Sequence, residues 1–234
     1  MVKQVQAYMN WSGGKDSALC LYKAMQSGVY NITHLLTSVN AAHNRISMHG
    51  VRRSLLEAQA KAIGLPLLTI ELPEQPGMAE YEEAMLAKVQ QLQQAGCTHT
   101  IFGDIFLEDL RIYREQKLKQ QGIECVFPLW KQDTTALVQE FIQLGFKTMV
   151  VCVNSQYLDK SFCGRVIDES FLNDLPAKVD PCGENGEFHS FVFEAPIFKQ
   201  PIPITKGEIV YKEYAAPTTV ESTYGFYFCD LLPA

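Results

Sequence analysis

The sequence predicts an α/β protein with a doubly wound, mostly parallel sheet and a smaller C-terminal α+β domain. Over about the first 150 residues, short apolar runs alternate with stretches of helical periodicity, and each of these stretches ends at a glycine. Continuous apolar runs are typical of strands buried on both faces of a parallel sheet. After about residue 155, turn residues and aromatic β-formers become frequent, which predicts a second domain.

Strands and helices are expected to alternate through the first domain. The strand-like runs are Val5–Trp11, Ile32–Val39, Leu67–Leu72, Thr98–Phe102, Glu124–Pro128 and Lys147–Val153. The helical stretches are Ser17–Gln26, Ser54–Ile63, Glu80–Ala95, Leu107–Gln121 and Thr134–Leu144. The glycines that end them are Gly28, Gly64, Gly96, Gly122 and Gly145. Glycine readily takes the left-handed conformation that closes a helix.

Antiparallel strands are expected in the second domain. Three late runs, Phe188–Phe193, Glu208–Tyr214 and Tyr224–Leu231, are rich in aromatic and other strand-forming residues. The predicted division is 1–155 for the first domain and 156–234 for the smaller second domain, with the boundary between roughly 145 and 170 because boundaries are hard to place from sequence.

Composition and charge exclude several classes of protein. The chain has 234 residues, of which 47% are hydrophobic and 20% charged, enough to bury a sizeable core. Its net charge is -6, and clustered Lys and Arg are absent, so direct nucleic-acid binding is not expected. No apolar run approaches the roughly 18 residues of a membrane span.

Cysteine usage and the N-terminal run indicate the compartment. The seven cysteines include no C-x-x-C pair, and several lie in apolar runs, as Cys152 does. This pattern is typical of buried free thiols in a reducing environment rather than of disulfides or a zinc site. The run Met1–Val5 lacks the profile of a signal peptide. The sequence therefore predicts a cytoplasmic protein.

A glycine-containing loop joins the first strand to the first helix and is the principal candidate site. It reads Ser12-Gly13-Gly14-Lys15-Asp16-Ser17. Without Cβ atoms at Gly13 and Gly14, backbone amides can approach an anion, and the helix N-terminus adds further N–H donors. Lys15 offers positive charge and the two serines offer hydroxyls. Asp16 suggests either a Mg²⁺ ligand or a helix cap.

The alternative interpretation of this loop is an ordinary strand-to-helix turn. Its spacing is not G-x-x-x-x-G-K-[ST], so it is not a Walker loop. It does lie at the first strand–helix junction of a doubly wound pattern, and such folds bind ligands at the carboxyl ends of their strands. This placement favours a nucleotide site.

The loop resembles the pyrophosphate loop of the adenine nucleotide alpha-hydrolase superfamily, the N-type ATP pyrophosphatases. Members typically cleave ATP between the α- and β-phosphates, and the adenylate is attacked by ammonia, another amine or a sulfur donor. The resemblance implies phosphate contacts from Ser12, Gly13, Gly14, Asp16 and Ser17. It also implies that Ser38, at the end of the second strand, lies where the superfamily binds adenine through backbone contacts.

Further motifs resemble one branch, the diphthine–ammonia ligase family, whose members amidate the diphthine carboxyl of elongation factor 2. The motifs are Met48-His49, the run 55–66, Gly103-Asp104-Ile105, Asp109-Leu110-Arg111, Pro128-Leu129-Trp130, Gly164-Arg165 and the run 180–191. The chain departs from the family at Ser190, where Thr is frequent, and at His189. The loop 40–48 is also less acidic than in the family.

Two candidates lie after the fourth predicted strand. Asp104 stands at a strand's carboxyl end, where its oxygens could hold Mg²⁺ and serve catalysis, or where it could cap the next helix. Arg111 could bind phosphate bidentately. Alternatively, Arg111 pairs with Glu115 on the helix surface.

The run 180–191 supplies the remaining catalytic candidates. Glu184 and Glu187 lie in a glycine-bounded loop near His189 and could bind ammonium or act as a general base on it. The alternative is a hairpin turn with solvated charges. His49 precedes a helix and could face nucleotide or substrate, or be structural.

Three functions stay open at this point. The first is an ATP-dependent amide-forming ligase that uses ATP, Mg²⁺ and free ammonia on diphthine of elongation factor 2. The second is an adenylating enzyme for a different carboxylate, and the third is a non-catalytic nucleotide-binding protein. Homo-oligomer formation is compatible with each of them, and a membrane partner is not expected.

Overall fold

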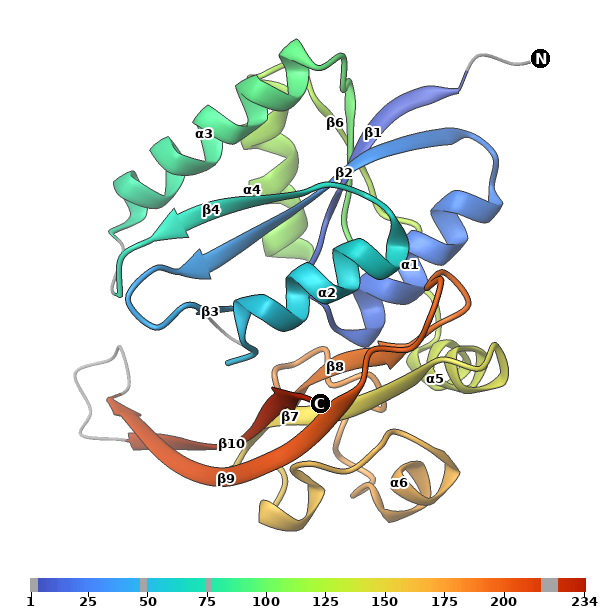
Figure 1. The fold of residues 1–234 in the computed structure, drawn as a ribbon, viewed down its shortest axis with the longest axis vertical. Helices are drawn as coiled ribbons and strands as arrows, with labels where there is room; N and C mark the ends of the chain where they lie inside the picture. The colour runs from blue at the N-terminus through green and yellow to red at the C-terminus, as the bar shows by residue number, and fades with distance from the viewer. Residues whose placement is uncertain (1–3, 47–49, 75–76, 216–222) are drawn as a thin grey trace.

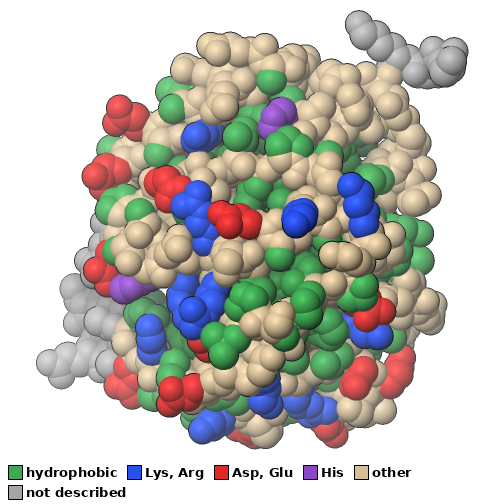
Figure 2. Space-filling view, viewed as in Figure 1, with side chains coloured by type: hydrophobic (Ala, Val, Ile, Leu, Met, Phe, Trp, Pro, Cys, Tyr) green, Lys and Arg blue, Asp and Glu red, His purple; other side chains and the backbone are tan. Residues whose placement is uncertain are grey.

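The computed structural model describes residues 4–46, 50–74, 77–215 and 223–234. Figure 1 shows two sheets separated by helices, with the N-terminal half of the chain in the upper sheet and the C-terminal part in the lower one. No helix in the described part of the chain is long and apolar enough to cross a membrane. Charged side chains of both signs are interspersed over the face shown in Figure 2.

The first sheet is mostly parallel. It contains β1 (Val5–Asn10), β2 (Tyr30–Asn40), β4 (Leu67–Leu72), β5 (His99–Ile101) and β6 (Glu124–Val126), with the short β3 (Arg45–Ile46) antiparallel to β2. β1 lies between β2 and β5, β4 pairs with β2, and β6 pairs with β5. The chain therefore builds the sheet first to one side of β1 and then to the other. The carboxyl end of β1 is the switch point at which such sheets bind ligands.

Helices cover both faces of this sheet. They are α1 (Lys15–Gln26), α2 (Arg53–Ile63), α3 (Met78–Gln94) and α4 (Glu108–Lys119). In Figure 1, α3 and α4 lie on one face, whereas α1 and α2 lie between this sheet and the second one. Side chains of β1 alternate accordingly, because Tyr8 belongs to the core under α3 and α4 while Ala7 and Met9 belong to the larger core on the opposite side.

The second sheet is antiparallel. Its strands are β7 (Lys147–Asn154), β8 (Phe188–Glu194), β9 (Ile204–Ala215) and β10 (Thr223–Pro233), in the order β8-β7-β10-β9. Helix α5 (Thr134–Gln143) precedes it, and the short η1 (Lys160–Phe162) and α6 (Glu169–Asp174) lie between β7 and β8. Because β8 stands at one end of this order, one of its edges is available to another part of the molecule.

The structure confirms the predicted fold class and most predicted elements, and it corrects one placement. The run 147–153 was expected as a sixth parallel strand, but β7 pairs antiparallel with β8 and β10. The reason is that β7 is nearly continuously buried, and such an apolar run looks the same in either kind of sheet. The division at residue 155 stays a prediction. The chain passes from the first sheet to the second between β6 and β7.

The helix ends and cysteines agree with the sequence. Each glycine expected to close a helix has a positive φ, for example 86° at Gly64. The cysteines are free thiols, and six of them are buried. Burial raises the pKa of Cys182 to about 12, so that this thiol is protonated at neutral pH.

Candidate active site

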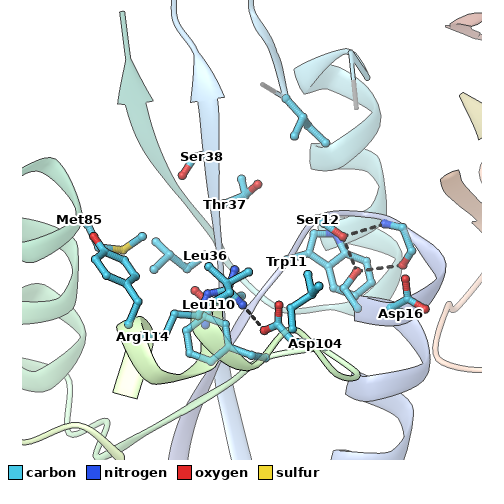
Figure 3. Close-up of a pocket in the computed structure, with 18 of the residues that line it drawn as sticks. Trp11, Ser12, Asp16, Leu36, Thr37, Ser38, Met85, Asp104, Leu110 and Arg114 are labelled. Atoms are coloured by element: carbon cyan, nitrogen blue, oxygen red, sulfur yellow. Dashed lines mark hydrogen bonds and ion pairs between the residues drawn. The ribbon is translucent and has the colours of Figure 1, made fainter. Parts of the chain in front are cut away.

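A cavity of about 1310 Å³ opens at the carboxyl ends of β1, β2 and β5. Ser12, Ser38 and Asp104, each following or ending one of these strands, all line it. Figure 3 shows the three side chains around one space, with Met85 of α3 on the side away from Ser12. Leu110 of α4 also lines the cavity. The cavity continues to the second sheet, where Tyr224 and Phe226 complete its wall.

The glycine loop is hydrogen-bonded to the edge strand β8 of the second sheet. Gly13 has a φ of 77°, a conformation that side-chain-bearing residues rarely adopt. Its carbonyl oxygen accepts hydrogen bonds from Val192 N of β8 and from Gln59 Nε2, both at 2.9 Å. A Cβ atom at Gly13 would lie 2.7 Å from Gln59 Oε1. The loop geometry therefore requires glycine here and depends on both sheets.

Gln59 of α2 is a functional-site residue that sequence reasoning missed. Its side chain is fully buried, and its amide accepts from Trp11 Nε1 at 2.9 Å while donating to the carbonyls of Gly13 and Val192. One buried amide thus connects β1, the loop and β8. The available signal was a glutamine on the apolar face of a predicted helix, where a polar side chain needs buried partners.

Two serine hydroxyl groups accept hydrogen bonds from backbone amides at the start of α1. Gly14 N–H donates to Ser12 Oγ, and Lys15 N–H donates to Ser190 Oγ of β8, each at 3.2 Å. Ser12 Oγ also lies 3.1 Å from Ser17 Oγ. These contacts are local, and hydroxyls can rotate to donate instead of accept. The same atoms could therefore surround an anion.

Lys15 is buried beneath the loop rather than aimed into open space. It is 4% exposed, and its ammonium lies 2.7 Å from Asp16 and also donates to the carbonyl of Cys182. Burial would lower the pKa of Lys15, but Asp16, Cys182 and Glu184 together outweigh burial and raise this pKa above its ordinary value. Lys15 therefore joins the start of α1 to the loop 180–187.

Asp104 forms an ion pair with Arg114 of α4, drawn as a dashed line in Figure 3. Arg114 also lies with its guanidinium 4.4 Å from the ring centroid of Phe102. Both charged groups line the cavity. Sequence reasoning missed Arg114. Its position one turn after Arg111 places it on the same face of the helix as that candidate, and this spacing could have indicated it.

Arg111 lies apart from this group. Its Nε donates to Glu115 Oε1 at 2.8 Å, which is the alternative pairing considered from the sequence. Its guanidinium also lies 4.5 Å from the ring centroid of Trp130 and 4.8 Å from that of Phe127. Arg111 is not among the described residues that line the cavity.

The two glutamates of the run 180–191 have different environments. Glu184 lines the cavity and accepts from Ile105 N at 2.7 Å. Burial raises the pKa of Glu184 to about 7, against the opposing effect of the Ile105 hydrogen bond. A carboxyl group with this pKa exchanges its proton near neutral pH, as a general base requires.

Glu187 instead organises its own loop. It is 1% exposed, and its carboxylate accepts from Asp180 N at 3.0 Å, from Asn185 N at 2.9 Å and from Asn185 Nδ2 at 3.1 Å. It does not appear among the described residues that line the cavity. The loop geometry thus depends on Glu187, whereas Glu184 presents a carboxyl group to the cavity.

The histidine and adenine-site predictions have separate outcomes. Ser38 lines the cavity beside Thr37, at the carboxyl end of β2. His49 lies outside the described residues. His189 lines the cavity from β8, and burial lowers its pKa to about 4, so the imidazole is neutral at physiological pH.

The carboxylates near the loop do not form a metal site of their own. No group of three or more His, Cys, Asp or Glu side chains in the described ranges could hold a metal ion. Asp16 is paired with Lys15, and Asp104 is paired with Arg114. This donor set fits only a Mg²⁺ ion whose remaining ligands are phosphate oxygens and water.

Comparisons with known proteins match both parts of the chain to one family. A family model described as diphthamide synthase N-terminal domain matches residues 5–125, and one described as diphthamide synthase C-terminal domain matches residues 133–223. A diphthine–ammonia ligase of Danio rerio is 27% identical over 222 residues, covering 85% of this chain and 86% of the relative. Proteins of the same name from Homo sapiens and Bos taurus are 25% and 24% identical over 222 residues, covering 85% of this chain and 82% of each relative.

Proposed function

The chain belongs to the diphthamide synthase family, and we propose on this premise that it is an ATP-dependent diphthine–ammonia ligase. In this reaction, a carboxylate oxygen of diphthine on elongation factor 2 attacks the α-phosphorus of ATP, and pyrophosphate leaves. Ammonia then attacks the acyl adenylate, and AMP leaves as the amide forms. One observation carries the proposal: Gly14 and Lys15 at the start of α1 and Glu184 of the loop 180–187 line the same cavity.

The loop 12–17 would hold the phosphates of ATP. A helix N-terminus presents N–H donors and the positive end of a dipole to an anion. The hydroxyls of Ser12 and Ser190, which accept from the amides of Gly14 and Lys15, would turn away and donate to phosphate oxygens. The cation of Arg114 lies at the same cavity and can offset further negative charge.

Adenine would lie at the end of β2, beside Ser38 and the apolar side chain of Leu36. Mg²⁺ bound to ATP would neutralise charge on the departing pyrophosphate, with Asp16 and Asp104 as the residues able to hold it. In this proposal ATP, Mg²⁺ and ammonia act together within one cavity.

Glu184 is the proposed general base. Ammonia that attacks an acyl carbon becomes positively charged and must lose a proton before the amide is complete. A carboxylate with a pKa near 7 can accept this proton and release it to water at neutral pH. Glu187 contributes through loop geometry alone, because its oxygens already accept three hydrogen bonds.

The test is incubation of the protein with ATP, Mg²⁺, ¹⁵N-ammonium and elongation factor 2 that carries diphthine. We expect the labelled amide by mass spectrometry, together with equal amounts of AMP and pyrophosphate. The variant Glu184→Gln should form AMP slowly and accumulate little amide, whereas exchange of the exposed Glu57→Gln should change neither product. ADP and phosphate as products would contradict adenylation, and ATP binding without turnover would favour a nucleotide-binding protein.

A further inference from the structure

The turn that follows β6 lies against the loop that follows β5. Three motifs identified in the sequence meet there: Gly103-Asp104-Ile105, Asp109-Leu110-Arg111 and Pro128-Leu129-Trp130. The first two contribute Asp104 and Leu110 to the cavity, but Arg111 and the residues of the third motif are not among its described lining. Arg111 and Trp130 can therefore affect the site only through residues that they hold in place.

Arg111 of α4 packs on two aromatic rings of the segment 127–131. Its guanidinium lies 4.5 Å from the ring centroid of Trp130 and 4.8 Å from that of Phe127, and the two rings lie 5.8 Å apart. A planar guanidinium stacks on aromatic rings, which an ammonium group does not. Trp130 N–H donates to Phe127 O at 3.1 Å and closes the turn between the two rings. The arginine therefore holds this turn against α4.

Lys131 ends the turn in an unfavourable backbone conformation. Its φ is 57°, and Asn44 is the only other non-glycine residue of the described ranges with a positive φ. A residue with a side chain keeps this conformation only where its surroundings enforce it. The side chain of Lys131 is exposed, but its N–H donates to Ile105 O at 2.7 Å. The backbone of Lys131 is thus held in position by Ile105, and Ile105 by Lys131.

Ile105 connects this turn to Glu184. Ile105 is fully buried, and its N–H donates to Glu184 Oε1 at 2.7 Å. Among the described residues, this N–H is the only hydrogen-bond partner of the Glu184 carboxyl group. The loop that carries Ile105 also packs closely on α1, since a Cβ atom at Gly103 would lie 3.1 Å from the backbone of Asp16. The direction of the Glu184 carboxyl group therefore depends on the position of one backbone amide.

We propose that Arg111, Trp130 and Lys131 are positioning residues that set the direction of the Glu184 carboxyl group through the backbone of Ile105. Their effect on catalysis rests on the proposed function, in which Glu184 takes a proton from the attacking ammonia. A displaced carboxyl group slows this step, and water then attacks the acyl carbon instead. AMP leaves, the carboxylate of the acceptor forms again, and AMP accumulates without amide.

Two pairs of variants test the proposal in the assay with ATP, Mg²⁺, ¹⁵N-ammonium and elongation factor 2 that carries diphthine. Trp130→Leu removes the ring on which Arg111 packs, and Trp130→Phe keeps a ring there. Lys131→Val keeps the N–H but disfavours a positive φ, which Lys131→Gly adopts readily. We expect the amide formed per AMP to fall about two- to tenfold in Trp130→Leu and Lys131→Val, as for the loss of one hydrogen bond. Trp130→Phe and Lys131→Gly should keep the wild-type ratio, and calorimetry should show unchanged ATP affinity in all four.

Combination with Glu184→Gln distinguishes positioning from a general loss of structure. If Trp130 and Lys131 act through Glu184, their variants cause no further loss of amide once Glu184 is glutamine. Losses that multiply in the double variants would overturn the proposal. Lys131→Val leaves the side chains of the ring stack unchanged, so it keeps the test valid where Trp130→Leu fails to fold.

The matched control is Glu115→Gln. Arg111 Nε donates to Glu115 Oε1 at 2.8 Å, and glutamine keeps an acceptor there while removing the charge. The amide formed per AMP should stay as in the wild type. A loss as large as that of Trp130→Leu would assign the effect to the ion pair on α4 and would contradict the role of the rings.

The amide resonance of Ile105 gives a measurement without turnover. In protein labelled with ¹⁵N-isoleucine, this resonance is the one that Ile105→Val removes. We expect Trp130→Leu, Lys131→Val and Glu184→Gln each to shift its proton upfield, because a bond to a carboxylate is the stronger one. These shifts in a protein that forms no AMP would support the positioning residues and reject the ligase. Amide formation by the wild type, with no change of ratio or resonance in Trp130→Leu and Lys131→Val, would support the ligase and reject the positioning residues.

Discussion

Gln59→Leu tests whether one buried amide holds the two sheets and the phosphate loop together. Leucine has nearly the volume of glutamine and favours helix, so α2 itself should persist. The change removes the acceptor of the buried Trp11 indole N–H and one donor from each of the carbonyls of Gly13 and Val192. Gly13 O keeps its bond from Val192 N.

The expected loss follows from these three bonds. An unsatisfied buried donor costs about 1–3 kcal/mol, and each lost neutral hydrogen bond costs about 0.5–1.5 kcal/mol. Added hydrophobic burial of leucine offsets part of this loss. We therefore expect the free energy of unfolding to fall by about 2–4 kcal/mol, and ATP affinity to fall because the loop loses a fixed position.

Urea unfolding followed by tryptophan fluorescence measures the first effect, and calorimetric titration with ATP measures the second. Gln91→Leu is the matched control, because Gln91 is exposed on α3. It should change stability by less than about 0.5 kcal/mol. A Gln59→Leu protein as stable as this control, with unchanged ATP affinity, would refute the role assigned to the amide.

Four further predictions concern the loops. Glu187→Gln should lower the free energy of unfolding by about 2–4 kcal/mol, because the carboxylate of Glu187 accepts three hydrogen bonds. It should also reduce ATP binding and amide formation together. Urea unfolding, calorimetric titration with ATP and mass spectrometry of the amide measure these three effects. Amide formation at constant free ammonia should rise with pH through about 7 as Glu184 ionises, and Glu184→Gln should flatten that rise. The same raised pKa predicts that the contribution of Glu184 to stability falls between pH 4.5 and about 7, where the folded state keeps a proton that the unfolded state has lost. Because the lowered pKa of His189 acts in the opposite direction over part of this range, the fall is measured as the difference in stability between wild type and Glu184→Gln. Gly13→Ala should cost about 1–3 kcal/mol of stability, because φ is 77° and the added Cβ would lie 2.7 Å from Gln59 Oε1; a thermal melt with unchanged midpoint would contradict it.

Local patterns predicted the first sheet well. Apolar runs gave β1, β2, β4, β5 and β6 to within a few residues, since each strand is short and bounded by turn residues. The partner of β7 could not be predicted, because pairing direction depends on segments far away in the chain. The short α6 carried too few turns for a periodic signal.

The candidate site was predictable where it depends on one segment. The loop 12–17 combines a strand end, two glycines and a helix start, and its place at the cavity follows from chain order. Contacts between distant segments were not predictable. Gln59 and Arg114 act through partners 46 and 10 residues away. The separate roles of Glu184 and Glu187 were not predictable either, because the sequence does not show which of the two residues lines the cavity.

The most direct measurement is a crystal structure of the protein with an α,β-methylene analogue of ATP and Mg²⁺. The account predicts phosphate oxygens within hydrogen-bond distance of the Gly14 and Lys15 amides, in place of the Ser12 and Ser190 hydroxyls that these amides contact in this structure. Phosphates bound elsewhere in the cavity, with both hydroxyl contacts intact, would contradict it.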